Sequence, residues 1–179
     1  MKDCGPIRSA RPNRLAALPL ALAAFAATLS MACGAGTKVE PVPDPEPGTP
    51  EAGVVQTPPP GAKSVAVTLR EWAVEPAEPA VAAGGVYFLA TNAGALAHEL
   101  VVIKTDLAPD ALPENDGRVP EDDIDMIGEI SPFSPGSKAS TVLELEPGDY
   151  ALICNVVETV NGERVSHYLN GMYTAFTVQ

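Results

Sequence analysis

Histidine and cysteine are both scarce in this sequence of 179 residues, which contains two histidines and three cysteines. The histidines are His98 and His167, and the cysteines are Cys4, Cys33 and Cys154. Two histidines are too few for a metal centre that needs three or more imidazole ligands. Only Cys154 lies in the C-terminal part of the chain, which excludes a disulfide within that part. A lone thiol must be buried or engaged with a partner if it is to persist in an oxidising compartment.

Basic residues are also few, with 11 Lys and Arg against 23 Asp and Glu. Residues 64–179 contain five basic and eighteen acidic residues, a formal charge of −13. Nucleic acids and anionic lipid head groups are poor partners for such a surface, so we expect no nucleic-acid binding. A protein partner with a basic docking surface would be complementary. Solubility or adaptation to salt explains the acidity equally well.

The N-terminal region is typical of an export signal. Residues 1–14 carry four basic residues against one acid, and residues 15–29 form an apolar run that is short for a membrane span. Residues 30–33, SMAC, resemble the lipobox of bacterial lipoproteins, although Ser30 stands where that pattern prefers Leu. The resemblance implies a lipid on Cys33 that anchors the protein to the outer face of the cytoplasmic membrane, on the periplasmic or extracellular side. Simple cleavage of the signal is the alternative.

The chain after the signal divides into a linker and one domain. Residues 33–63 contain eight prolines between Pro41 and Pro60 and have no apolar periodicity, which predicts an acidic, extended tether. Residues 64–179 are long enough for one domain with a hydrophobic core, which we expect to be monomeric. The expected organisation is therefore an export signal over 1–32, a tether over 33–63 and a folded domain over 64–179.

The domain is predicted to be all-β. Alternating or β-branched and aromatic segments indicate six strands, at 65–69, 86–91, 99–104, 140–145, 149–154 and 173–178. A seventh is expected within 72–81, where Pro76 and Pro79 restrict it to an edge. Residues 105–139 are acidic and rich in proline, and we expect a solvated excursion with a short strand near 126–130. No segment has helical periodicity, so a Greek-key β-sandwich of about seven to eight strands is predicted.

Four side chains that bind soft metals fall at the ends of these strands. His98 precedes the 99–104 strand, Cys154 closes the 149–154 strand, and His167 and Met172 lie in the loop before the last strand. Two imidazoles, one thiolate and a weak axial thioether are the ligand set of blue-copper electron-transfer sites. The pattern therefore predicts one mononuclear copper ion.

The same residues carry a family resemblance. Residues 92–99 (NAGALAHE), 145–154 (LEPGDYALIC) and 167–172 (HYLNGM) are similar to the ligand segments of cupredoxins of the plastocyanin, azurin and sulfocyanin type. The resemblance implies a cupredoxin-like sandwich that passes single electrons between redox protein partners. It also implies that His98, Cys154 and His167 bind copper and that Met172 binds axially. The ring edge of His167 would face solvent as the electron port, with Tyr168, Leu169 and Met172 in an apolar docking rim.

The sequence departs from that family in two places. Twelve residues separate Cys154 from His167, where plastocyanin-like and azurin-like loops have only a few. The additional segment, VVETVNGERVS, is predicted to be an inserted hairpin with its turn near Asn161-Gly162. Glu99 follows the first histidine in place of the Asn of plastocyanin and azurin, so the hydrogen bonding of the thiolate is open.

The ligand inventory argues against an enzyme. A binuclear oxidase-type centre needs a second nearby cysteine, and nitrite reductase or multicopper oxidase chemistry needs further histidines. A hydrolytic zinc site requires three non-thioether ligands and a general base. Two alternatives to electron transfer remain open: a copper carrier or storage protein, and a metal-free cupredoxin-like interaction module. Trp72 and Tyr87 are interpreted as core residues.

Overall fold

The computed structural model describes residues 52–179, which form eleven strands and one short 3-10 helix. The predicted export signal, Cys33 and the first part of the predicted tether lie outside the described residues. The elements are β1 (Lys63–Arg70), β2 (Ala73–Pro76), β3 (Ala80–Val81), β4 (Gly84–Asn92), β5 (His98–Lys104), η1 (Glu121–Asp123), β6 (Asp125–Phe133), β7 (Lys138–Leu145), β8 (Gly148–Ile153), β9 (Val157–Val160), β10 (Glu163–Ser166) and β11 (Tyr173–Val178).

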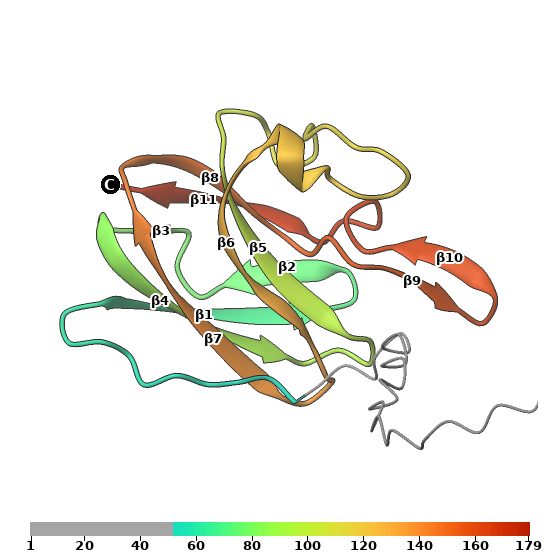
Figure 1. Cartoon of the computed structure of the whole chain (residues 1–179), viewed down its shortest axis with the longest axis horizontal. Coiled ribbons are helices and arrows are strands. Elements are labelled where there is room, and N and C mark those ends of the chain that lie inside the picture. The colour runs from blue at the N-terminus through green and yellow to red at the C-terminus, as the bar shows by residue number, and fades with distance from the viewer. Residues whose placement is uncertain (1–51) are drawn as a thin grey trace, which may run out of the picture. The chain divides into compact units, whose positions relative to one another are not determined.

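Two sheets form the body of the domain (Figure 1). One has the order β2-β1-β4-β7 and the other β3-β11-β8-β5-β6, so the chain passes from sheet to sheet several times, as in a Greek-key sandwich. The main core cluster draws buried side chains from both sheets, including Val67 and Phe88 from the first and Leu152 and Phe176 from the second. The predicted all-β sandwich is confirmed.

The six strands predicted from sequence pattern are all present as β1, β4, β5, β7, β8 and β11. In β1 the alternation is visible in the burial of Val65, Val67 and Leu69, with more exposed residues between them. The strand expected within 72–81 is instead two short strands, β2 and β3, at edges of different sheets. These and the hairpin strands β9 and β10 account for the larger number of strands.

The segment between β5 and β7 is more ordered than the predicted solvated excursion. Its strand, β6, extends over nine residues, and Leu112 and Val119 before it are buried. They join a second core cluster with Val101, Ile103 and other residues on the outer face of β5 and β8. The strand near 126–130 is confirmed and most residues of 105–125 are exposed, but the prediction missed the burial of Leu112 and Val119, which follows because β5 has apolar residues on both faces. A strand with two apolar faces needs a cover on each side.

Residues 53–56, from the C-terminal part of the predicted tether, lie along the first sheet. The amide of Ser140 donates a hydrogen bond to the carbonyl of Val54 at 2.9 Å, and the amide of Gln56 donates to Oγ of Ser140 at 2.7 Å. Tyr87 Oη donates to the carbonyl of Gln56 at 2.9 Å. Within the described part of the chain there is no helix with the length and hydropathy that crossing a bilayer requires.

Candidate metal centre

The pairing of three antiparallel strands brings the predicted ligands to one end of the sandwich. β5 pairs with β8, with Val101 opposite Ile153, so His98 at the start of β5 lies near Cys154 just after β8. β8 also pairs with β11, with Tyr173 opposite Ile153. The residue before β11, Met172, accepts a hydrogen bond at its carbonyl from the Cys154 amide at 3.0 Å.

The loop from His167 to Met172 is closed by its own backbone. The amide of Met172 donates to the carbonyl of His167 at 3.1 Å, and the amide of Gly171 donates to the carbonyl of Tyr168 at 2.9 Å. Gly171 has φ 106°, a conformation that side chains with a Cβ rarely adopt. The amide of His167 is bonded to the carbonyl of Val156 at 2.9 Å, which ties the loop back to the residues after Cys154.

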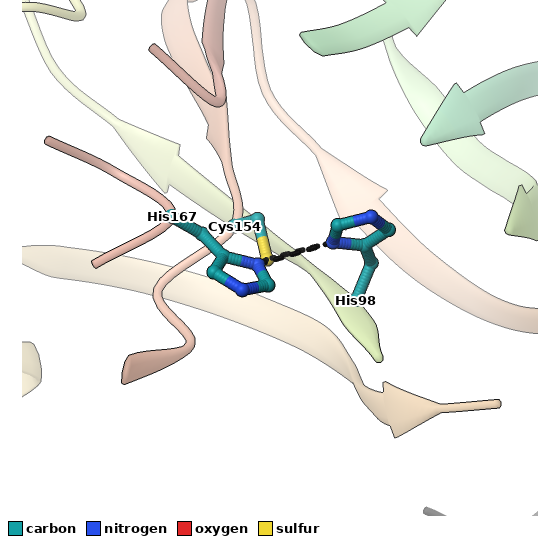
Figure 2. Close-up of side chains that lie close together, drawn as sticks. All are labelled: His98, Cys154 and His167. Carbon is teal, nitrogen blue, oxygen red and sulfur yellow. Dashed lines mark hydrogen bonds between the residues drawn. The ribbon is translucent and has the colours of Figure 1, made fainter. Parts of the chain in front are cut away.

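Three donor side chains meet there (Figure 2). Nδ1 of His98 lies 3.1 Å from Nδ1 of His167. Sγ of Cys154 lies 3.3 Å from Nδ1 of His167 and 3.9 Å from Nδ1 of His98. All three residues are fully buried. Within residues 52–179 they form the one group of His, Cys, Asp or Glu side chains close enough to share a metal ion.

The separations fit a shared ion. Zinc, for example, binds imidazole nitrogen at about 2.0–2.1 Å and thiolate sulfur at about 2.3 Å, so two of its ligands cannot lie further apart than about 4.1–4.4 Å. All three separations in the structure are below that limit. One thiolate and two imidazoles with a thioether nearby are a donor set suited to copper. The residues therefore fit one mononuclear copper ion.

Each imidazole has a carboxylate beside its other ring nitrogen. Nε2 of His167 lies 2.9 Å from Oε1 of Glu158, on β9. A carboxylate only accepts, so His167 donates from Nε2 and its Nδ1 presents a lone pair to the centre. Nε2 of His98 lies 3.3 Å from Oε1 of Glu71, although this contact is not aligned as a hydrogen bond. When His98 is in the same Nε2–H form, the two Nδ1 lone pairs face each other at 3.1 Å, and a cation between them removes their repulsion.

The loop between β4 and β5 is shaped around His98. The amides of Ala95 and Leu96 donate to Oε1 of Glu71 at 2.8 and 2.7 Å, which fixes the carboxylate beside the ring. A Cβ on Gly94 would lie 2.6 Å from both Oε1 of Glu71 and Nε2 of His98. Asn92, which is fully buried, accepts from the Gly94 amide at 3.0 Å. Glycine is therefore required at position 94 for the close approach of Glu71 and His98.

Burial keeps all three donors neutral when no metal is bound. It raises the pKa of Cys154 to about 12, with a further contribution from the negative charge of Glu99. It lowers the pKa of His167 to about 4. Burial and the neighbouring His167 lower the pKa of His98, against the opposing effect of Glu71. A metal ion that binds here must therefore displace the thiol proton, and finds both imidazoles already unprotonated.

The sulfur of Cys154 has amide neighbours. The amide of Glu99 donates to Sγ at 3.4 Å, and the amide of Val156 also favours the thiolate by lowering the pKa of Cys154. Glu99 therefore supplies a hydrogen bond to the Cys154 sulfur from its backbone amide and not from its side chain. The carboxyl itself is buried, and burial, together with the charge of Glu129, raises the pKa of Glu99 to about 7.

The expected exposure of the ligand loop is corrected. His167 is not exposed at its ring edge, because Glu158 covers Nε2 and Trp72 packs edge-on against the ring with centroids 5.2 Å apart. Tyr168 is also buried, since its hydroxyl donates to the carbonyl of Pro109 at 2.8 Å. Met172 is fully buried, so of the three residues expected in an apolar rim only Leu169, 60% exposed, is at the surface.

The sequence interpretation missed the two carboxylates. Glu71 lies in the turn between β1 and β2, and Glu158 lies within the inserted segment, and neither has a local pattern that marks it as a neighbour of a histidine. The hairpin itself is confirmed: β9 pairs with β10, and Asn161 and Gly162 at its turn have φ of 53° and 87°. An acidic residue inside an insertion next to the ligand loop was the only available indication.

The domain has the sandwich and the donor arrangement that the resemblance to cupredoxins predicts. No family model matches the sequence, and no curated protein matches it significantly. This chain is similar to solved structures, of which three are compared with it by sequence identity, coverage and TM-score. Dithionite-reduced auracyanin from Roseiflexus castenholzii is 21% identical, with 66% of this chain and 99% of that chain covered and a TM-score of 0.48.

Auracyanin A from Chloroflexus aurantiacus, described as a "blue" copper protein, is 17% identical, with 66% of this chain and 100% of that chain covered and a TM-score of 0.46. Rusticyanin from Thiobacillus ferrooxidans is 16% identical, with 72% and 87% covered and a TM-score of 0.41. The assignment of the metal centre rests on the side chains of this chain.

Proposed function

We propose that the protein is a blue-copper electron carrier in which His98, Cys154 and His167 bind one copper ion and Met172 is the weak axial ligand. The observation that carries the proposal is the meeting of two Nδ1 atoms 3.1 Å apart with the Cys154 sulfur 3.3 and 3.9 Å from them. Met172 supports the axial role because it is fully buried and its backbone is bonded to those of both Cys154 and His167.

The surroundings of the donors favour electron transfer over catalysis. All three donors are fully buried, so a substrate has no access to an ion held by them, whereas an electron needs only a short path through packed protein. Copper bound there would supply a one-electron couple. The chain's contribution is to hold the donors within strands and hydrogen-bonded loops, so that little rearranges when the charge of the centre changes.

Burial also distinguishes this proposal from a copper carrier or storage protein. A carrier must release its ion to a partner or chelator, which exposed ligands allow more easily than buried ones. We expect one copper per chain, a reversible one-electron wave in voltammetry, and slow loss of copper to an excess of a strong chelator. Rapid and complete transfer of copper to the chelator would favour the carrier instead.

The cellular setting is part of the proposal and rests on residues 1–63. The export signal and Cys33 support a lipid-anchored protein on the outer face of the cytoplasmic membrane, where it would exchange electrons with protein partners of basic surface. The matched test compares wild type with Cys33→Ala in membrane fractions of an expressing bacterium. Wild type should remain with the membranes and Cys33→Ala should be released; equal distribution would contradict the lipid anchor.

A further inference from the structure

The inserted hairpin carries an acidic residue directly onto a proposed ligand. β9 and β10 form a two-stranded sheet that pairs with neither larger sheet, and Figure 1 shows it projecting from one end of the sandwich. Glu158, on β9, places Oε1 2.9 Å from Nε2 of His167, and its side chain is 31% exposed while the ring is fully buried. The hairpin therefore contacts a proposed ligand directly through the Glu158 side chain.

We propose that Glu158 is a positioning residue for the metal centre: its carboxylate holds His167 in the Nε2–H form, directs Nδ1 to the ion and closes the outer edge of the ring to solvent. This inference rests on the proposed copper site and deepens it. Outer partners of this kind fix the orientation and tautomer of a metal-binding histidine and raise its basicity.

The backbone around Glu158 supports the assignment. Val157 and Ser166 are opposite each other in the hairpin, and His167 follows Ser166 directly, so the first pair of the hairpin fixes the start of the ligand loop beside β9. The His167 amide bond to the carbonyl of Val156 continues this pairing by one step. The carboxylate and the ring that it contacts are thus held by the same short ladder.

The other histidine has a similar arrangement from an unrelated part of the chain. Glu71 is fixed by the amides of Ala95 and Leu96 and lies 3.3 Å from Nε2 of His98. Trp72, the next residue, packs edge-on against His167 at 5.2 Å. Both outer nitrogens therefore face a carboxylate, but only the contact of Glu158 with His167 has the alignment of a hydrogen bond, so the positioning role is assigned to Glu158.

The test separates the hydrogen bond of Glu158 from its charge. Glu158→Gln keeps an acceptor oxygen and loses the charge, and Glu158→Ala loses both. Glu163→Gln is the matched control, because it removes the same charge from the same hairpin at an exposed position of β10. The three variants are compared with the wild type in three measurements: the tautomer of His167 in the metal-free state by nitrogen-15 NMR, the copper affinity, and the reduction potential.

We expect wild type, Glu158→Gln and Glu163→Gln to keep His167 in the Nε2–H form, and Glu158→Ala to lose this preference. Copper affinity should fall by about 10–100-fold in Glu158→Ala and by less in Glu158→Gln. The reduction potential should rise in both Glu158 variants, since a negative charge near the oxidised ion is lost, and should stay unchanged in Glu163→Gln.

Two outcomes would overturn the inference. In the first, Glu158→Ala has the same His167 tautomer, copper affinity and reduction potential as the control Glu163→Gln, which would show that the carboxylate does not position the ring. A lower unfolding temperature of Glu158→Ala with an unchanged tautomer and potential would reduce Glu158 to a structural role. If wild type binds no copper, the proposed function fails, whereas the metal-free tautomer still decides whether Glu158 positions His167.

Discussion

His98 and His167 face the same point, yet different parts of the fold support them. His98 begins β5, which lies between β8 and β6 in the five-stranded sheet and has six of its seven residues buried. His167 follows β10, which among the strands of residues 52–179 pairs with β9 alone. The first ligand is therefore fixed by the core of the domain and the second by a local insertion. Such a division lets the insertion alter the centre while the sandwich remains unchanged.

The largest effect is expected next to His98. Glu99→Gln should stabilise the metal-free domain by up to about 3 kcal/mol at pH 8 and by little at pH 4. The pKa of Glu99 is raised from 4.5 to about 7, first by burial, so the folded state retains this proton more strongly than the unfolded state. The carboxyl therefore costs stability as pH rises from about 4.5 to 7, by about 1.4 kcal/mol per unit of pKa difference.

Urea denaturation of Glu99→Gln, with Glu163→Gln as the exposed control, measures this difference. A gain of equal size at both pH values would contradict the cause given for it.

Shortening the hairpin tests whether the insertion supports His167. Replacing residues 158–165 by two glycines removes Glu158 and most of the β9–β10 ladder. Copper affinity should fall by about 100-fold, the upper end for loss of an outer partner, and the visible spectrum should change. The unfolding free energy of the metal-free domain should change little, since the hairpin pairs with neither large sheet.

The matched control replaces only Asn161-Gly162 by two glycines, which keeps both strands and Glu158. It should bind copper as wild type does. A shortened hairpin that keeps the copper spectrum and affinity but slows reduction by a partner would identify the hairpin as a docking element instead.

Gly94→Ala should weaken the support of His98 itself. The new Cβ would lie 2.6 Å from Nε2 of His98 and from Oε1 of Glu71, so one of them must move. We expect a loss of about 1–3 kcal/mol in unfolding free energy, as for overpacking elsewhere, and weaker copper binding. Gly85→Ala is the control, because its nearest atom, 3.0 Å away, is the end of the flexible Glu144 side chain. Equal stability of the two variants would contradict the close packing at Gly94.

The smallest expected effect is the change of copper affinity with each pH unit. The pKa of Cys154 is about 12, while burial holds the pKa values of both histidines below their usual range. Binding between pH 7 and 9 should therefore release one proton, and the apparent affinity should rise about tenfold per pH unit. Competition with a copper chelator at several pH values measures this slope. A slope near zero would mean that the thiolate is not a ligand.

Much of the fold follows from local patterns. The six long strands show alternation or β-branched runs between turn residues, and the Asn161-Gly162 hairpin has a strong local signature. The three clustered donors could be predicted as well, because each lies at a strand end that a sandwich brings to one side. These features depend on neighbours in the sequence or on strand order alone.

The parts that could not be predicted depend on contacts between distant residues. Glu71 reaches Ala95 across 24 residues, and no periodicity connects the two. The burial of Tyr168 depends on the packing of the long acidic segment, whose composition indicates a solvated loop. The loss of exposure at His167 likewise depends on where the hairpin lies after folding, which its turn residues do not determine.

The most direct test of the copper centre is the visible absorption spectrum of the protein after addition of copper(II) and an oxidant, with Cys154→Ser as the reference. We expect an intense thiolate-to-copper band in the wild type that saturates at one copper per chain and bleaches reversibly on reduction. Cys154→Ser should have no such band. A wild type that remains colourless and binds no copper would contradict the assignment of His98, Cys154 and His167.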